Sequence, residues 1–198
     1  SVICIGHGAL GRLFGRGWQA YADQLRAAGA AASFAMLATR SRWDRFLAAE
    51  PTVNGVPVRF HHVTPETATA ADLVIFAVKA NHLDDAIHDA HSSIGRGTIL
   101  LSLLNGISSE DALRSSFPSA RVVMATAQGM DATRDDYQLR YRNLGTITYG
   151  LRRSEQQDPA LRAAISDLDA WFRATATPGG YLADMEHQYW AKFMLNCG

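Results

Sequence analysis

Short apolar runs alternate with amphipathic stretches along the whole chain. Four runs, residues 2–5, 34–38, 72–78 and 98–104, are apolar almost throughout, as expected of strands buried on both faces. A fifth run covers residues 121–127. Apolar residues recur at helical spacing after these runs, over residues 10–28, 42–49, 81–94 and 159–174. This alternation predicts an α/β fold, with a doubly wound and mainly parallel sheet covered by helices on both faces.

Turn and capping residues refine this pattern. Asn54-Gly55 precedes an alternating apolar stretch and predicts a small hairpin or an edge strand. Ser108, with Asp111 three residues later, predicts the N-cap of a helix that reaches about residue 117. Asp158-Pro159 predicts the start of the helix over 159–174. Residues 137–150 predict two strands joined near residues 143–145, and Asp184 predicts the cap of a final helix.

Composition narrows the class of protein. The 198 residues are 47% hydrophobic and 19% charged, as in a globular domain. Lys plus Arg and Asp plus Glu number 19 each, so we expect no broad basic surface for nucleic acid. No apolar run reaches the roughly 18 residues that a membrane-spanning helix needs, and the first residues lack the features of a signal peptide. Cys4 and Cys197 are expected to be free thiols, and the cytoplasm is the expected compartment.

Three glycines follow the first predicted strand in the sequence "GHGALG", residues 6–11. In a dinucleotide-binding turn, Gly6 permits the tight turn, Gly8 lets the backbone approach a pyrophosphate, and Gly11 lets the helix pack near the strand. The helix N-terminus adds amide donors and a partial positive charge. The alternative is an ordinary glycine-rich turn. The position between a strand and a helix favours the dinucleotide site.

The end of the second predicted strand indicates which dinucleotide is bound. An acidic residue there accepts hydrogen bonds from the ribose of NAD, whereas a cation suits the 2′-phosphate of NADP. The sequence provides Arg40 and Arg42, with no acid before Asp44, and therefore favours NADP(H). Arg40 lies about ten residues farther from Gly11 than the usual spacing of roughly 20, which a longer first helix would accommodate. The alternative is a pair of solvated loop arginines.

Polar residues also follow other strands, where a doubly wound fold binds its ligands. Lys79 ends the run over 72–78, and Asn105-Gly106 end the run over 98–104, although a surface lysine and a simple turn are alternatives. Lys192 and Asn196 lie four residues apart on one face of the last helix. Apolar neighbours could desolvate Lys192 and lower its pKa, as a general acid requires, but a surface lysine is the alternative. The histidines and aspartates of 82–91 indicate a solvated helix face and not a metal site.

The sequences "GHGALG", "FAVKANHLDDAI", "LLSLLNGISSEDAL" and "DMEHQYWAKFMLNCG" occur in the order and spacing of the ketopantoate reductases (2-dehydropantoate 2-reductases). The chain resembles the N-terminal, Rossmann-type NADP-binding domain of that family along almost its whole length. The resemblance implies NADPH-dependent reduction of 2-dehydropantoate, a small 2-oxo acid, to pantoate. It implies a division into a dinucleotide-binding domain over 1–180 and the start of a connecting helix over 181–198.

The resemblance also implies roles for single residues. Lys192 matches the catalytic lysine of the family, which protonates the ketone oxygen, and Asn196 matches a substrate-binding asparagine. Asn105 matches an asparagine near the nicotinamide ribose and the substrate, and Lys79 a lysine of the cofactor cleft. Arg40 is the best match to the arginine that binds the 2′-phosphate. The remaining cofactor-binding positions are those of the glycine loop, Gly6, His7, Gly8, Ala9, Leu10 and Gly11.

The chain departs from the family pattern in three respects. His7 stands where the family more often has a small residue, and the spacing to Arg40 is long. The all-helical C-terminal domain of the family, which closes the substrate cleft and forms much of the homodimer contact, is missing from this sequence. The sequence is therefore expected to be either a fragment of a longer protein or a short form that binds the cofactor without turnover. The alternative functions are a cofactor-binding module or redox sensor without turnover, and a related dehydrogenase of the opine or glycerol-3-phosphate type.

Overall fold

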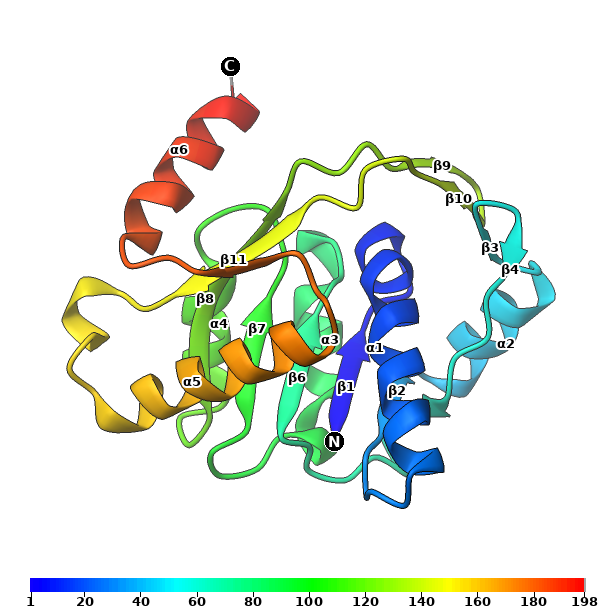
Figure 1. Cartoon of the computed structure of the whole chain (residues 1–198), viewed down its shortest axis with the longest axis horizontal. Helices are drawn as coiled ribbons and strands as arrows, with labels where there is room; N and C mark the ends of the chain where they lie inside the picture. The colour runs from blue at the N-terminus through cyan, green and yellow to red at the C-terminus, as the bar shows by residue number, and fades with distance from the viewer. Residues whose placement is uncertain (198) are drawn as a thin grey trace.

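Eight strands form the central sheet of the computed structural model, which describes residues 1–197 and the side chains of residues 1–194 (Figure 1). In spatial order these strands are β12 (Gly179–Tyr181), β11 (Thr146–Gly150), β8 (Arg121–Gln128), β7 (Ile99–Ser102), β6 (Leu73–Phe76), β1 (Val2–Ile5), β2 (Phe34–Leu37) and β5 (His62–Val63). All neighbours are parallel except β8 and β11. From β5 to β8 the strand order is that of a doubly wound Rossmann-type sheet, so the predicted fold class is confirmed.

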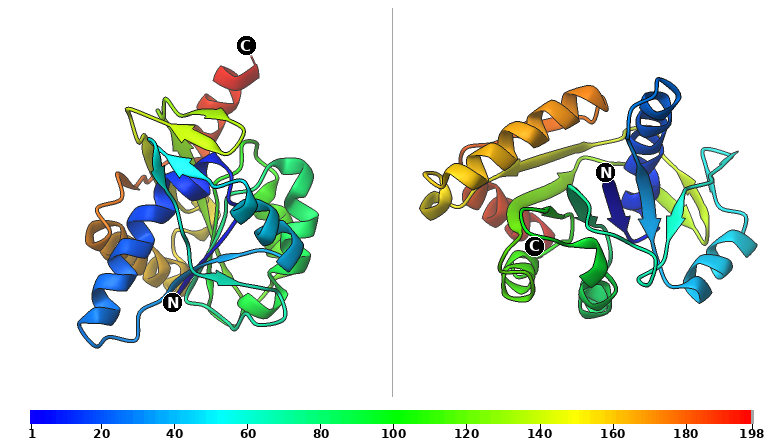
Figure 2. Two further views of the ribbon diagram at one scale, coloured as in Figure 1. Left: turned by 90° about the vertical axis from the view of Figure 1, so that its right-hand side faces the viewer. Right: turned by 90° about the horizontal axis from the view of Figure 1, so that it is seen from below.

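Helices cover both faces of this sheet (Figure 2). One face carries α1 (Ala9–Ala27) and α5 (Pro159–Ala174), and the other carries α3 (Leu83–Asp89) and α4 (Ser109–Ser116). α2 (Arg40–Ala48) flanks the β2 side, and α6 (Met185–Cys197) stands beyond the end at which the parallel strands finish. Three short 3₁₀ turns complete the helical elements: η1 (Ala80–His82), η2 (His91–Ser93) and η3 (Arg153–Glu155).

Alternation of side chains along the strands divides the core into two layers. Cys4 points to the face of α1 and packs in one cluster with Phe14 and Trp18. Ile3 and Ile5 point to the opposite face and join a second cluster with residues of α3 and α4. This arrangement follows from the two-residue period of a strand, and it explains why the strand segments are apolar at every position.

A second, four-stranded sheet has the order β4 (Val56–Pro57), β3 (Thr52–Val53), β10 (Gln138–Arg140) and β9 (Thr133–Asp135). The predicted hairpin forms here, with positive φ angles of 50° at Asn54 and 76° at Gly55. The expectation of two strands joined near residues 143–145 describes β10 and β11, but these strands belong to different sheets. β10 pairs with β3, more than 80 residues earlier, and such a non-local partner leaves no local signal.

The predicted helix caps give mixed results. The Asp158 carboxylate accepts hydrogen bonds from the backbone N–H groups of Ala160 and Leu161, at 2.8 and 3.1 Å, which confirms the start of α5. Ser108 does precede α4, but its side chain makes no capping hydrogen bond, so that part of the prediction is wrong. Asp184 precedes α6 and accepts from the N–H of His187 at 3.2 Å. The division of the chain at residue 180 stays a prediction.

Candidate functional site

The loop between β1 and α1 contains two positions at which the packing of the backbone requires glycine. Gly6 has a φ of +110°, and a Cβ atom there would lie 2.6 Å from the carbonyl oxygen of Ala77. A Cβ atom at Gly11 would lie 1.9 Å from the carbonyl oxygen of Gly6. Neither position can hold a larger residue without moving the backbone, because real Cβ atoms do not approach so closely. These contacts bring the end of β1, the start of α1 and the end of β6 together.

Gly8 is different, because no protein contact requires a glycine there. A Cβ atom at Gly8 would have only an ordinary contact, 3.9 Å from the carbonyl oxygen of Ala77. Gly8 is also the N-cap of α1, where no side chain caps the helix and no acid lies in the first turn. The first N–H groups of this 19-residue helix therefore have no side-chain partner among the described residues. This arrangement, at Gly8 and the following Ala9 and Leu10, suits an anionic group that approaches the backbone closely.

A cavity of about 390 Å³ lies beside this loop, at the carboxyl ends of β1, β2 and β6. This is the point at which the strand order reverses, where doubly wound proteins bind their ligands. The cavity brings together Gly6, His7, Gly8 and Lys79 of the predicted site. Of the residues that line it, the basic side chains are Arg42, Arg45, Lys79 and Arg134, whereas Asp89 is the one acid. The excess of positive charge favours a ligand that carries phosphate groups.

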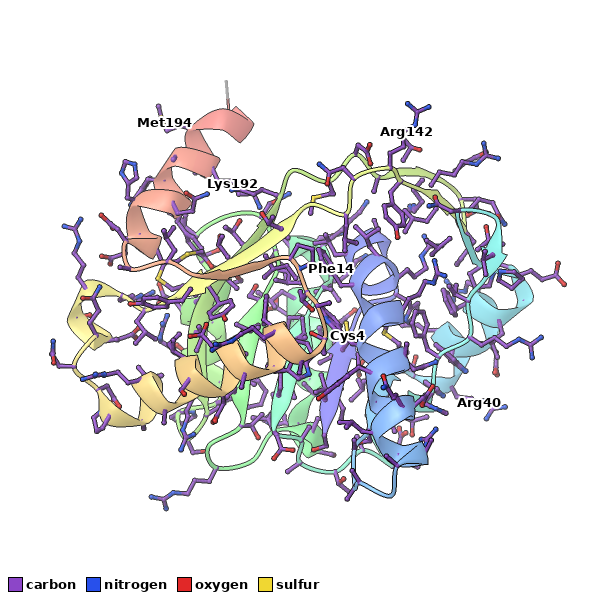
Figure 3. All side chains as sticks on the ribbon, in the orientation of Figure 1. Cys4, Phe14, Arg40, Arg142, Lys192 and Met194 are labelled. Carbon is purple, nitrogen blue, oxygen red and sulfur yellow. The ribbon has the colours of Figure 1, made fainter. Side chains whose placement is uncertain are left out.

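Two arginines of the β2–α2 connection differ in their surroundings. Arg40 begins α2, projects from the edge of the molecule (Figure 3), and pairs with Asp44 at 3.0 Å in an exposed ion pair. Arg40 is not among the residues that line the cavity. Arg42 does line it, and it pairs with two carboxylates of α3, Asp85 at 2.8 Å and Asp89 at 3.5 Å. Arg42 is therefore held by two carboxylates of α3, whereas Arg40 has a single, exposed partner on its own helix.

His7 is an uncharged wall of the cavity. Its ring packs against Phe46, with ring centres 4.9 Å apart, and against Trp43 at 5.9 Å. Burial, together with charge interactions with His62, Arg12 and Arg42, lowers the pKa of His7 to about 4. Its Nδ1 atom has no hydrogen-bond partner among the described residues. His7 therefore contributes a neutral imidazole to the lining of the cavity.

Arg12 is a residue that the sequence analysis missed. Its side chain is only 1% exposed, although it is charged, and it lies on the buried side of α1. Nε donates to the carbonyl oxygen of Gly8 at 3.3 Å, and Nη1 donates to the carbonyl oxygen of Tyr137 in the turn between β9 and β10. Arg12 thus links the glycine loop to the hairpin whose Arg134 and Tyr137 line the cavity. An arginine within the apolar stripe "GRLFGRGW" is the signal that could have identified it.

The other predicted polar residues lie at the ends of the next two strands. Asn105 is exposed in the loop that follows β7. Lys192, on α6, donates from Nζ to the carbonyl oxygen of Ala127 near the end of β8, at 2.8 Å. Lys192 is half-buried, and burial lowers its pKa. Neither residue lines the cavity beside the glycine loop, and the side chain of Asn196 lies outside the described residues.

A second cavity among the described residues does not suggest a binding site. A more open hollow of about 660 Å³ lies against the second sheet, but its carboxylate, Asp131, is already bound by the N–H groups of Arg142 and Asn143. Among residues 1–197, no group of three or more His, Cys, Asp or Glu side chains is placed to hold a metal ion. Within the same range, none of the helices combines the length and apolar character needed to cross a membrane.

Comparisons with known proteins agree on one group of relatives. Residues 2–154 match the family model described as ketopantoate reductase PanE/ApbA. A 2-dehydropantoate 2-reductase of Vibrio cholerae is 24% identical over 204 residues, which cover 100% of this chain and 60% of that protein. This chain therefore spans about 60% of the length of the relative.

Solved structures show the same fold. A 2-dehydropantoate 2-reductase from Geobacter metallireducens superposes with a TM-score of 0.74 at 21% identity, over 99% of this chain and 62% of that one. A D-mandelate dehydrogenase in complex with NADH and anilino(oxo)acetate superposes with a TM-score of 0.75 at 19% identity, over 97% and 60% of the two chains.

Proposed function

Because this chain belongs to the ketopantoate reductase family, we propose that it is the cofactor-binding part of an NADPH-dependent reductase that converts 2-dehydropantoate to pantoate. The observation that carries the proposal is Lys192, an ammonium group held at the end of β8 with a lowered pKa. A carbonyl group that gains a hydride develops negative charge on its oxygen, and a positioned ammonium group can stabilise that charge and donate a proton. The other small 2-oxo acids are alternative substrates.

The glycine loop and the cavity fit a dinucleotide. The free N–H groups at the start of α1 would bind the pyrophosphate, and the open space at Gly8 would let it approach. Lys79, exposed at the end of β6 and lining the cavity, would add a positive charge to the same cleft. When bound, NADPH supplies the hydride for the keto carbon. The protein supplies the position, the counter-charges and the proton.

The choice of NADP(H) over NAD(H) rests on the arginines of the β2–α2 connection. The fold alone does not decide it, since D-mandelate dehydrogenase, which shares the fold, is described in complex with NADH. We assign the 2′-phosphate to Arg40, because its exposed pair with Asp44 is weak and easily exchanged for a phosphate. Arg42 adds positive charge to the wall of the cavity but is not assigned to the 2′-phosphate, because Asp85 and Asp89 already hold it.

Lys192 has the capacity for its proposed role. An ammonium group has three N–H donors, and one of them goes to the carbonyl oxygen of Ala127, which leaves two for a substrate. Burial lowers the pKa of Lys192, and this brings proton donation closer to neutral pH. Lys192 and Lys79 are the two lysines of the chain, and the other 17 of its 19 Lys and Arg residues are arginines. Arginine does not release its proton, so among these cations only a lysine can serve as the proton donor.

Asn105 and Asn196 complete the proposed site as substrate-binding residues, with Asn105 also near the nicotinamide ribose. We further propose a cytoplasmic enzyme that forms a homodimer. A ketopantoate reductase of Staphylococcus aureus, similar in fold at 16% identity, is described as dimeric.

The test is the oxidation of NADPH by the full-length protein in the presence of 2-dehydropantoate. Lys192→Ala should lower kcat by roughly 10²- to 10⁴-fold, the usual contribution of a general acid. Lys79→Ala is the matched control, because it removes the only other lysine and should mainly raise the KM for NADPH. A Lys192→Ala variant with unchanged kcat would contradict the catalytic assignment. Oxidation of mandelate-type 2-hydroxy acids with NAD, without turnover of 2-dehydropantoate with NADPH, would indicate a related dehydrogenase.

A further inference from the structure

The edge of β8 on the side of β7 is only partly used by the sheet. β8 covers Arg121–Gln128, but its pairing with β7 ends at Val123, opposite Leu101. Alternate residues of a strand direct their N–H and C=O groups to the same edge, so Ala125 and Ala127 present unpaired backbone groups beyond that point. Buried backbone groups require partners. Side chains of α6 supply them.

Two residues of α6, one turn apart, occupy this free edge. Nζ of Lys192 donates to the carbonyl oxygen of Ala127, as described above. The hydroxyl of Tyr189 accepts a hydrogen bond from the N–H of Ala125 at 2.8 Å, and it lies 2.6 Å from the carbonyl oxygen of the same residue. Met185 at the start of α6 is fully buried and packs against Met124 of β8 in the same cluster. The position of Lys192 therefore depends on how Tyr189 attaches α6 to β8.

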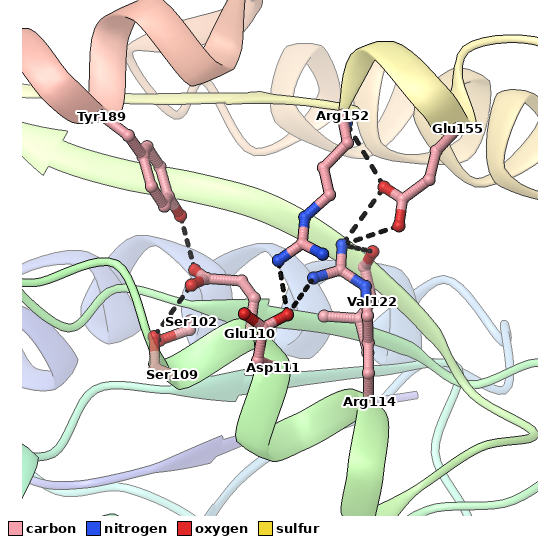
Figure 4. Close-up of polar contacts among 9 residues, drawn as sticks. All are labelled: Ser102, Ser109, Glu110, Asp111, Arg114, Val122, Arg152, Glu155 and Tyr189. Atoms are coloured by element: carbon pink, nitrogen blue, oxygen red, sulfur yellow. Dashed lines mark hydrogen bonds and ion pairs between the residues drawn. The ribbon is translucent and has the colours of Figure 1, made fainter.

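The hydroxyl of Tyr189 has a third polar neighbour. Oε1 of Glu110, in the first turn of α4, lies 2.5 Å away (Figure 4). A tyrosine hydroxyl has a single proton, which cannot serve both the Ala125 carbonyl and Glu110. With an ionised Glu110, one of these two short contacts would join two oxygen atoms with no proton between them. A protonated Glu110 removes the conflict, because it donates to Tyr189 while Tyr189 donates to Ala125.

The remaining contacts of Glu110 agree with a neutral carboxyl group. Its other oxygen accepts from the hydroxyl of Ser109 at 3.1 Å, and Ser109 in turn accepts from Ser102, at the end of β7, at 2.7 Å. Every hydroxyl in this series then donates once, from Ser102 through Ser109, Glu110 and Tyr189 to Ala125. The series connects the ends of β7 and β8 with α4 and α6. Side-chain networks with all their donors used are the ones that fix a single arrangement.

The charged groups around Glu110 do not provide it with an ion pair. Arg114, on the same helix, pairs with Glu155 at 3.1 Å, and Arg152 pairs with Asp111 (Figure 4). Both guanidinium groups are thus engaged by other carboxylates. Glu110 is 2% exposed, and burial raises its pKa, although Tyr189, Ser109 and Arg114 counteract the shift. Burial likewise raises the pKa of Tyr189.

We propose that Glu110 is a neutral carboxylic acid in the folded protein, and that the Glu110–Tyr189 pair is a positioning device that fixes α6, and with it Lys192, on the free edge of β8. The inference rests on the proposed function, since it assigns to Lys192 the catalytic role given above. Neither Glu110 nor Tyr189 touches the reacting atoms in this scheme. They act through Lys192.

The test compares four variants of the full-length protein. Tyr189→Phe and Glu110→Ala should lower kcat by roughly tenfold to a hundredfold, the usual effect of a small misplacement of a catalytic group, with the affinity for NADPH unchanged. Glu110→Gln should keep the wild-type kcat, because its amide can donate to Tyr189 and accept from Ser109 as the neutral acid does. Tyr181→Phe is the matched control, since Tyr181 is 45% exposed on β12, outside this network.

A pH profile separates positioning from a purely structural role. Loosening α6 would hydrate Lys192, whose pKa would rise, so the alkaline limb of kcat should move to higher pH in Tyr189→Phe but not in Tyr181→Phe. Suppose that Lys192→Ala is inactive. The inference would then be overturned if Tyr189→Phe and Glu110→Ala kept the wild-type kcat and the wild-type alkaline limb of the pH profile. A Glu110→Gln variant as impaired as Glu110→Ala would overturn it as well.

A second measurement does not depend on turnover. Because the pKa of Glu110 is raised in the folded state, its neutral carboxyl group stabilises the fold fully at pH values below the pKa of Glu110 in the unfolded chain. This stabilisation is lost as pH rises through the folded-state pKa. The stability of the wild type relative to Glu110→Gln should therefore fall with rising pH. A constant difference would refute the neutral acid. An active Lys192→Ala variant would refute the proposed function alone, because this comparison would still decide the state of Glu110.

Discussion

Replacing Arg40 tests the proposed preference of the protein for NADPH over NADH. Arg40→Ala removes a guanidinium group whose present partner is Asp44, at 3.0 Å in an exposed pair. A hydrogen bond to a charged group contributes about 1.5–3 kcal/mol, and the exposed pair that must first break contributes about 0.2–1 kcal/mol. The net contribution to NADPH binding is therefore about 0.5–2.8 kcal/mol, which corresponds to a loss of affinity of roughly 2- to 100-fold.

The assay is a fluorescence titration of the protein with each cofactor. NADH lacks the 2′-phosphate, so its affinity should not change in Arg40→Ala, and the preference for NADPH should fall by the same factor as the NADPH affinity. Arg42→Ala is the matched control, because Arg42 lines the cavity but is held by Asp85 and Asp89. Equal losses for NADH and NADPH in Arg40→Ala would refute the reasoning. A larger loss of preference in Arg42→Ala would transfer the role to Arg42.

Two further predictions concern the glycine loop. Gly11→Ala should abolish NADPH binding and lower Tm, because its Cβ would lie 1.9 Å from the carbonyl oxygen of Gly6; Gly17→Ala, in open space on the same helix, should add about 0.5–1 kcal/mol of stability. Wild-type NADPH affinity in Gly11→Ala would show that the loop tolerates the displacement. The lowered pKa of His7, about 4, means that its neutral form stabilises the fold fully above the unfolded pKa near 6.5, and that this contribution is lost as pH falls towards 4. Denaturant titrations at several pH values should show wild-type stability falling, relative to His7→Leu, over that window, and a constant difference would contradict the shifted pKa.

Local patterns predicted the central sheet well, because the signals for its elements lie within the elements themselves. β1, the glycine loop and α1 follow each other directly in the sequence. The junction between this strand and this helix is therefore specified by residues that are neighbours in the sequence. Asp158 illustrates the same point, since its two hydrogen bonds lie within three residues of it. Such features depend on residues that are neighbours in the sequence, so the sequence pattern is sufficient to predict them.

Other features depend on neighbours in space and could not be predicted. β12 has only three residues, and it becomes a strand because β11, which precedes it by the whole of α5, lies beside it. Ser108 has the sequence of a cap but does not use its side chain as one. Glu110 looks like an ordinary acid in the first turn of a helix, and only the arrival of Tyr189, 79 residues later, buries it. Arg40 and Lys192 carry predicted roles that their positions permit and that the experiments above decide.

The free edge of β8 has a consequence for solubility. An unpaired strand edge is a template on which another molecule can add a strand, and proteins protect such edges by covering them. Here the cover consists of Tyr189 and Lys192, the latter also being the proposed proton donor. A substitution that detaches α6 would therefore expose an aggregation-prone edge at the same time as it displaces the lysine. The protection of this edge and the position of the lysine therefore depend on the same attachment of α6 to β8.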